Sequence, residues 1–131
     1  ASWYVKELGV RRVYLDKQRA KDGSTVIHDV TGELGPSDTA IIVDDMISSG
    51  ETMIQGAELL KKNGVTDIIV FSTHAVLSST ASKNLQESEI SHVFVTDSVF
   101  IPEEKKFAKL QVLSIADMIG KELQKIRSTH R

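Results

Sequence analysis

The chain has 131 residues, which suits a single domain large enough to bury its own core. Its formal net charge of −2 excludes the strong positive field expected of a nucleic-acid-binding or anionic-membrane-binding protein. It contains no cysteine, which excludes disulfides and thiolate metal sites, and no apolar run long enough to span a membrane. We therefore expect one soluble, cytoplasmic domain over residues 1–131, with no nucleic-acid or membrane partner.

Strand-like and helix-like patterns alternate along the chain. After a short helix that ends at Gly9, strands are expected at residues 12–15, 25–30, 39–43, 67–73, 92–96 and 110–113. Helices are expected at residues 51–63 and 80–87 and from Ser114 onward, and the charged residues 16–23 are expected to form a loop. This alternation over short links predicts an α/β fold with three layers, in which a mostly parallel sheet carries helices on both faces.

The segment from Ala40 to Thr52 is the most informative part of the sequence. An apolar run leads into two adjacent carboxylates, Asp44 and Asp45, at the expected carboxyl end of a buried strand, where open α/β sheets bind ligands. The residues that follow are small and rich in hydroxyl groups, and they lead into a helix: Ser48, Ser49, Gly50, Glu51 and Thr52. Backbone N–H groups at a helix N-terminus, together with the helix dipole, favour a bound phosphate.

The two carboxylates would repel a neighbouring phosphate unless they face another group. The hydroxyls of a sugar that carries the phosphate, or a cation held by them, would meet that need. The alternative is that Asp44 and Asp45 only cap the following turn, and the hydroxyl-rich loop with its glycine argues against it. The sequence therefore predicts a site for a phosphorylated ribose.

Residues 40–52 resemble, position by position, the phosphoribosyl-pyrophosphate signature of type I phosphoribosyltransferases and ribose-phosphate diphosphokinases. Three further segments resemble the C-terminal half of ribose-phosphate diphosphokinase, also called phosphoribosyl pyrophosphate synthetase: residues 72–78, 95–99 and 113–116. Residues 15–19 look like that family's flexible catalytic loop. The resemblance implies a type I phosphoribosyltransferase-like fold, with the family's first strand of this domain lying outside residues 1–131.

By this resemblance, the chain is the ribose 5-phosphate or phosphoribosyl pyrophosphate-binding domain of a ribose-phosphate diphosphokinase. That family makes phosphoribosyl pyrophosphate and AMP from ATP and ribose 5-phosphate with Mg²⁺, in nucleotide biosynthesis. Asp44 and Asp45 would contact the ribose, and Lys17 and Arg19 would be the catalytic cations on the transferring diphosphate. The residues around the 5-phosphate would be Ser48, Ser49, Gly50, Glu51 and Thr52. No side chain is expected to bind the metal directly, and the family implies a cytoplasmic homo-oligomer.

Two features depart from the family pattern. Ser48 stands where many members carry aspartate, and the Glu51 carboxylate would weaken phosphate binding unless it points to water. The family's N-terminal half is absent from these residues, so the domain is expected to be incomplete as an enzyme by itself. Two alternatives stay open: a phosphoribosyltransferase, for which no base-binding segment is evident, and a non-catalytic synthetase-associated module.

Three other polar residues lie at the same expected edge of the sheet. His74 ends one strand, and Asp97 and Ser98 follow another. A structural, hydrogen-bonded role is favoured for His74 over contact with a ligand or a neighbouring subunit, and a role in turning the chain is favoured for Asp97 and Ser98. Without the resemblance, Lys17 and Arg19 would be interpreted as solvated surface residues.

Overall fold

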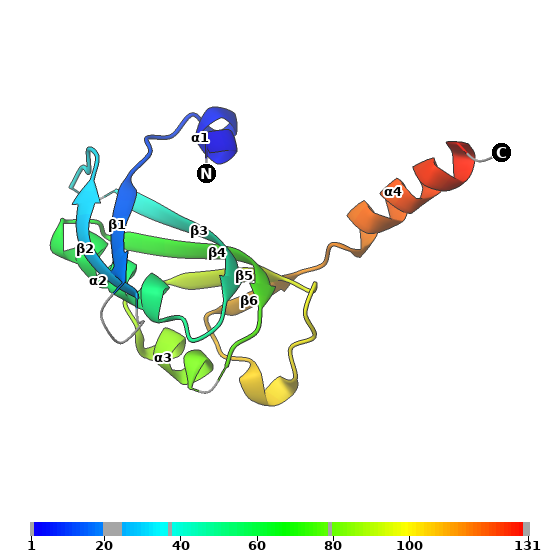
Figure 1. Cartoon of the computed structure of the whole chain (residues 1–131). Helices are drawn as coiled ribbons and strands as arrows, with labels where there is room; N and C mark the ends of the chain where they lie inside the picture. Colours follow the sequence, from blue (N-terminus) through cyan, green and yellow to red (C-terminus); the bar gives the residue numbers. More distant parts are fainter. Residues whose placement is uncertain (1, 20–24, 37, 79, 130–131) are drawn as a thin grey trace.

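The computed structural model describes residues 2–19, 25–36, 38–78 and 80–129, which form a four-stranded parallel sheet with a two-stranded antiparallel hairpin beside it (Figure 1). The strands are β1 (Tyr14–Arg19), β2 (Thr25–Thr31), β3 (Thr39–Ile47), β4 (Asp67–Ala75), β5 (His92–Thr96) and β6 (Leu110–Leu113). The helices are α1 (Ser2–Leu8), α2 (Glu51–Lys62), α3 (Ala81–Glu87) and α4 (Ala116–Thr129), with a 3₁₀ turn, η1, at Glu103–Lys105. The sheet order is β3-β4-β5-β6, and the hairpin consists of β1 and β2.

Alternation of side chains along the strands defines the core. In β4, Ile68 and Val70 are fully buried, whereas Phe71, which points to the opposite face, remains partly exposed. The buried face packs against apolar side chains of α2 and α3, among them Ala57 and Leu85. A parallel sheet flanked by helices confirms the predicted α/β class.

Strand and helix positions agree closely with the sequence, but β3 and β4 extend further than expected. The strand predicted at residues 39–43 continues to Ile47, because Asp44, Met46 and Ile47 stay in register with partners on β4. Asp44 and Asp45 therefore lie inside β3 rather than after it, near its carboxyl end. Residues 92–96 and 110–113 form strands with the predicted boundaries.

The prediction of a loop over residues 16–23 is wrong for its first half. Residues 16–19 belong to β1, so Lys17 and Arg19 lie on a strand rather than in a loop. The cause is tertiary: β1 pairs with β2, and the hydroxyl of Thr31 donates a hydrogen bond of 2.9 Å to the carboxylate of Asp16. The remaining residues of that prediction, 20–23, lie outside the described residues.

Helix α4 extends away from the sheet (Figure 1). Its apolar residues follow helical spacing but are exposed: Met118, Ile119, Leu123 and Ile126. The loop before it is fixed to the body, since the carboxylate of Asp97 accepts a hydrogen bond of 2.9 Å from the Ile115 amide. Among the described residues, no helix combines the length and apolar character that crossing a membrane requires.

Candidate functional site

The N-terminus of α2 is built around Gly50. This glycine is the N-cap residue with a left-handed φ of 79°, and it has no side chain with which to cap the helix by a hydrogen bond. The first bond across the turn joins the Ile54 amide to the Gly50 carbonyl at 3.0 Å. The amides of residues 51–53 therefore have no partner in the regular hydrogen-bond pattern of the helix. The Glu51 amide has only a long 3.4 Å contact with the hydroxyl of Ser49. An oxyanion placed here would find free or weakly held N–H donors.

Two constraints make residue 50 a glycine. A positive φ is strained for residues that carry a Cβ. A Cβ built on Gly50 would also lie 3.1 Å from Cγ and 3.2 Å from Cδ2 of Leu85, a fully buried side chain of α3. The loop therefore packs so closely against α3 that a side chain at position 50 would crowd Leu85.

The loop after β4 supports the residues before α2. The carbonyl of Ile47 accepts hydrogen bonds from the amides of Val76 and Leu77, and the Ser78 amide donates to the Ser48 carbonyl at 3.0 Å. The two serine hydroxyls lie 3.1 Å apart. Leu77 takes a positive φ of 48° in the middle of the three residues whose amides bond to Ile47 and Ser48. Ser78 is a site residue that sequence reasoning did not single out, although it lies in one of the segments that carry the resemblance.

Asp44 and Asp45 lie beside this loop and are open to solvent. Asp44 is half-buried, and one of its carboxylate oxygens accepts a hydrogen bond of 2.9 Å from the Asp45 amide. Its other oxygen, Oδ2, lies 3.8 Å from Nζ of Lys17, which reaches it from the hairpin. Both side chains of this ion pair are partly exposed, so the pair contributes at most about 1 kcal/mol to stability. The carboxylates are therefore accessible to a ligand.

The structure brings some predicted site residues together and leaves others apart. Lys17, Asp44 and Thr52 line one groove of about 980 Å³ that runs beside β3, whereas other predicted site residues do not line it: Asp45, Ser48, Ser49 and Gly50. Arg19 and Glu51 are exposed, and within the described residues neither makes an ion pair. The Glu51 carboxylate can therefore turn to water, which is the condition expected from the sequence for a phosphate site here.

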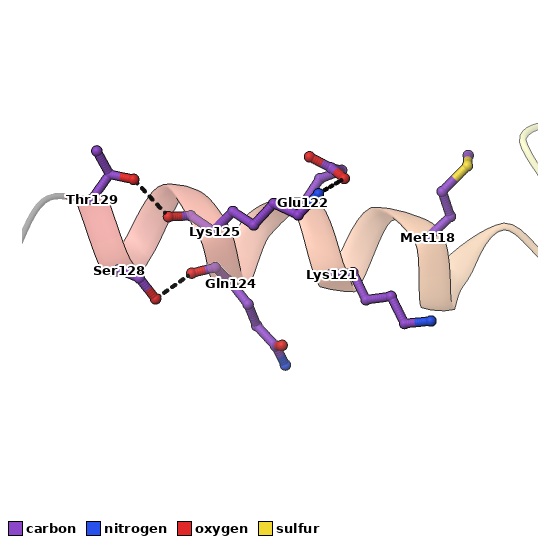
Figure 2. Close-up of a pocket in the computed structure, with 7 residues that line it drawn as sticks. All are labelled: Met118, Lys121, Glu122, Gln124, Lys125, Ser128 and Thr129. Atoms are coloured by element: carbon purple, nitrogen blue, oxygen red, sulfur yellow. Dashed lines mark hydrogen bonds and ion pairs between the residues drawn. The ribbon is translucent and has the colours of Figure 1, made fainter.

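A second hollow, of about 650 Å³, lies on α4 and has a different character (Figure 2). Its polar groups bond within the helix itself: Lys125 pairs with Glu122 at 2.6 Å, and the hydroxyl of Ser128 donates to the Gln124 carbonyl. One exposed helix supplies all of its lining residues, so no groups converge on a ligand. The groove beside β3 is the better candidate site.

His74 takes the hydrogen-bonded role that the sequence favoured, and Asp97 and Ser98 form the turn after β5 as expected. The Ser98 hydroxyl donates to the Thr73 carbonyl, so Nδ1 of His74, 2.8 Å from that hydroxyl, acts as the donor in their bond. The Ser114 hydroxyl and the Ile115 amide both bond to the Asp97 carboxylate and lower its pKa below the ordinary value of 3.8. Asp97 thus joins the end of β5 to the start of α4.

The acids fit a shared metal better than a metal held by protein alone. No group of three or more histidine, aspartate or glutamate side chains that could hold a metal occurs among the described residues. Mg²⁺ is commonly bound by one or two carboxylates together with substrate phosphates and water. Asp44 and Asp45 are two carboxylates near which a diphosphate-bound Mg²⁺ would lie, and the expectation that no side chain binds the metal directly stays a prediction.

Comparison with known families now adds to this geometry. The model of the phosphoribosyl synthetase-associated domain matches residues 8–130. The chain belongs to this family. All the predicted site residues lie within the matched range, so the resemblance recognised in the sequence is confirmed at the level of the family.

Relatives of this family member are ribose-phosphate pyrophosphokinases. The chain is 34% identical over 126 residues to the enzyme of Caldanaerobacter subterraneus subsp. tengcongensis, covering 96% of this chain and 40% of that one. It is 41% identical over 117 residues to the enzyme of Parasynechococcus marenigrum, covering 86% and 34%. The crystal structure of phosphoribosylpyrophosphate synthetase from Mycobacterium smegmatis matches with a TM-score of 0.84 and 33% identity, covering 98% of this chain and 40% of that chain. The chain therefore spans 40% or less of the length of these relatives.

Proposed function

We propose that this chain is the ribose 5-phosphate and phosphoribosyl pyrophosphate-binding domain of a ribose-phosphate diphosphokinase. The family match supports the enzyme class. The observation that carries the proposal is the α2 N-terminus, which has no side-chain cap and lies next to two solvent-accessible carboxylates. N–H donors for a phosphate and acceptors for hydroxyls lie at one strand end, as a phosphorylated sugar requires.

In the proposed reaction, the anomeric hydroxyl of ribose 5-phosphate attacks the β-phosphorus of ATP, and AMP leaves. The amides that begin α2 would hold the 5-phosphate, while Asp44 and Asp45 would accept hydrogen bonds from the ribose hydroxyls and orient the attacking oxygen. Lys17 and Arg19 would offset the negative charge that spreads over the transferring oxygens. Mg²⁺ bound to the diphosphate, without a direct side-chain ligand, would supply further positive charge.

In this scheme Lys17 has two alternative partners, the Asp44 carboxylate and a bound diphosphate. Without a ligand, Nζ of Lys17 lies 3.8 Å from the Asp44 carboxylate. A bound diphosphate offers Lys17 more negative charge than a single carboxylate does, which would release Asp44 to accept the ribose hydroxyls. Because the ion pair is weak and partly exposed, this exchange costs little.

Calorimetric titration with ribose 5-phosphate and Mg²⁺ tests the proposal on the 131-residue chain. We expect binding by the wild type and at least a tenfold loss in the Asp44→Asn/Asp45→Asn variant, since neutral amides accept hydrogen bonds more weakly than carboxylates do. Asp117→Asn, a change at an exposed aspartate of α4, is the control and should bind like the wild type. Absence of heat with the wild type, or equal heat with the double variant, would contradict the proposed site.

The wider proposal is an enzyme of nucleotide biosynthesis that uses ATP, works in the cytoplasm and assembles from identical subunits. The named relatives support the enzyme class. Light scattering of the purified chain measures the assembly directly. Release of pyrophosphate from phosphoribosyl pyrophosphate on addition of a purine or pyrimidine base would instead favour a phosphoribosyltransferase.

A further inference from the structure

The hairpin that carries Lys17 rests on α2 at a glycine. Gly56 is buried, and a Cβ at this position would lie only 2.8 Å from Cδ1 of Leu15 on β1. The same point is 3.4 Å from Cδ1 of Ile27 on β2 and 3.7 Å from Cδ1 of Ile42 on β3. Gly56 is therefore where the hairpin, the sheet and the helix meet most closely.

The residue before this glycine fixes the hairpin by a hydrogen bond. Oε1 of Gln55 accepts the backbone N–H of Ile27 at 3.2 Å in a partly buried setting. Ile27 is the cross-strand partner of Lys17, and this pair lies next to an irregularity in the pairing, at which the register shifts between Asp16 and Lys17. Such irregularities re-aim the side chains that follow them. Gln55 thus anchors the hairpin at the residue that sits directly across from Lys17.

The pleat of the strands links this anchor to the site. Leu15 and Lys17 are two residues apart on β1, one on each side of the register shift, and Ile42 and Asp44 are two residues apart on β3 and share one side of it. The apolar pair, Leu15 and Ile42, meets at Gly56. The polar pair follows one step along both strands, and its atoms lie 3.8 Å apart. The packing at Gly56 therefore lies only two residues along each strand from the contact between Nζ of Lys17 and Asp44.

We propose that Gln55 is a positioning residue, which acts with Gly56 to hold Lys17 over the Asp44 end of the groove. This inference rests on the proposed function, because it assigns Lys17 to a ligand's diphosphate. Gln55 itself acts only through the Ile27 backbone. The simpler reading is that the Gln55–Ile27 bond only adds stability by attaching the hairpin to α2.

The chain offers a matched control for this bond. Oε1 of Gln86 on α3 accepts the backbone N–H of Lys109 at 3.1 Å, also in a partly buried setting, on a different helix. Gln55→Leu and Gln86→Leu each remove one glutamine-to-backbone bond, and each leaves an amide without its partner. We expect the two variants to lower the urea concentration at the unfolding midpoint by similar amounts. A purely structural role predicts that they also behave alike in binding.

Binding of two ligands separates the two roles. Phosphoribosyl pyrophosphate carries the diphosphate assigned to Lys17, whereas ribose 5-phosphate lacks it. In calorimetry with Mg²⁺, we expect Gln55→Leu to weaken phosphoribosyl pyrophosphate about tenfold and ribose 5-phosphate less than about twofold, with Gln86→Leu changing neither. Gln55→Glu keeps an acceptor oxygen for the Ile27 amide and should restore most of the affinity. Equal loss for both ligands, or equal behaviour of Gln55→Leu and Gln86→Leu, would overturn the proposal.

A double-mutant cycle tests the coupling itself. Lys17→Met should weaken phosphoribosyl pyrophosphate about tenfold in the wild type and less than about twofold in a Gln55→Leu background, where Lys17 is already displaced. Additive losses would show that Gln55 does not act through Lys17. If Gln55→Leu does not fold, Gln55→Asn, whose side chain is one methylene shorter, replaces it in both experiments.

A measurement without ligand keeps this inference distinct from the proposed function. The Asp45 amide bonds to the Asp44 carboxylate, so its NMR shift reports on the approach of Lys17. Lys17→Met should move that resonance in the wild type and in Gln86→Leu, but by less than half as much in Gln55→Leu. This result together with no ligand binding would support the positioning role and contradict the proposed function. An equal response in all three backgrounds would overturn the positioning role whatever the ligand data show.

Discussion

Replacing Gly50 by alanine tests the loop before α2 most directly. The change adds one methyl group at a residue with φ of 79°, a conformation that costs an L-residue about 1–2 kcal/mol. The new Cβ would lie 3.1–3.4 Å from three carbons of the buried Leu85, and crowding of this kind costs about 1–3 kcal/mol. The stiffer unfolded chain offsets about 0.4–1 kcal/mol of this loss. We expect Gly50→Ala to lower the free energy of unfolding by about 2–4 kcal/mol.

Urea unfolding followed by circular dichroism measures this loss, and calorimetry with ribose 5-phosphate measures the effect on the site. Because the methyl group pushes the loop away from Leu85, the amides that follow should move and the ligand affinity should fall at least tenfold. Gly120→Ala on α4 is the matched control, since a Cβ there meets no atom within 4 Å. Gly50→Asn separates the two costs, because asparagine tolerates a positive φ better than alanine does. A Gly50→Ala protein within about 0.5 kcal/mol of the wild type would refute this account of the loop.

The remaining predictions concern three side-chain contacts. Lys17→Met removes an exposed ion pair and should change the free energy of unfolding, measured in urea, by less than about 1 kcal/mol; a larger loss would mean that the pair is structural. Ser78→Ala removes the hydroxyl partner of Ser48 and should weaken ribose 5-phosphate a few-fold in calorimetry, with the fold unchanged, whereas unaltered affinity would separate that contact from the site. The lowered pKa of Asp97 stabilises the native state above pH 3.8, and this stabilisation is lost as the pH falls through the folded-state pKa. The Ile115 amide resonance should follow that titration in the wild type and stay constant in Asp97→Asn.

The sequence predicted the parallel sheet well because its signals there are local. Residues 92–96 and 110–113 are short apolar runs between turn residues, and both form strands with the predicted boundaries. The charged residues 16–19 gave the opposite signal and were wrongly predicted as loop. Their strand depends on pairing with β2, a contact that local composition does not encode.

The candidate site divides in the same way. The position of Asp44, Asp45 and the loop before α2 follows from an apolar run, two acids and a glycine read in order. Ser78 and Gln55 could not be identified from the sequence, because each gains its place through a partner distant in the chain. The binding roles of the predicted residues stay predictions until a ligand is measured.

The contacts around the candidate site also bear on how the molecule folds. The hydroxyls of Ser48 and Ser78 are 30 residues apart in sequence, the Thr31 hydroxyl and the Asp16 carboxylate are 15 apart, and His74 and Ser98 are 24 apart. Contacts between segments distant in the chain must therefore form before this region takes its final form, so a ligand of the proposed site would bind the folded chain. A ligand at a hundred times its dissociation constant would add about 2.7 kcal/mol to the native state alone. A higher concentration of such a ligand in the cell would then raise the fraction of the protein that is folded.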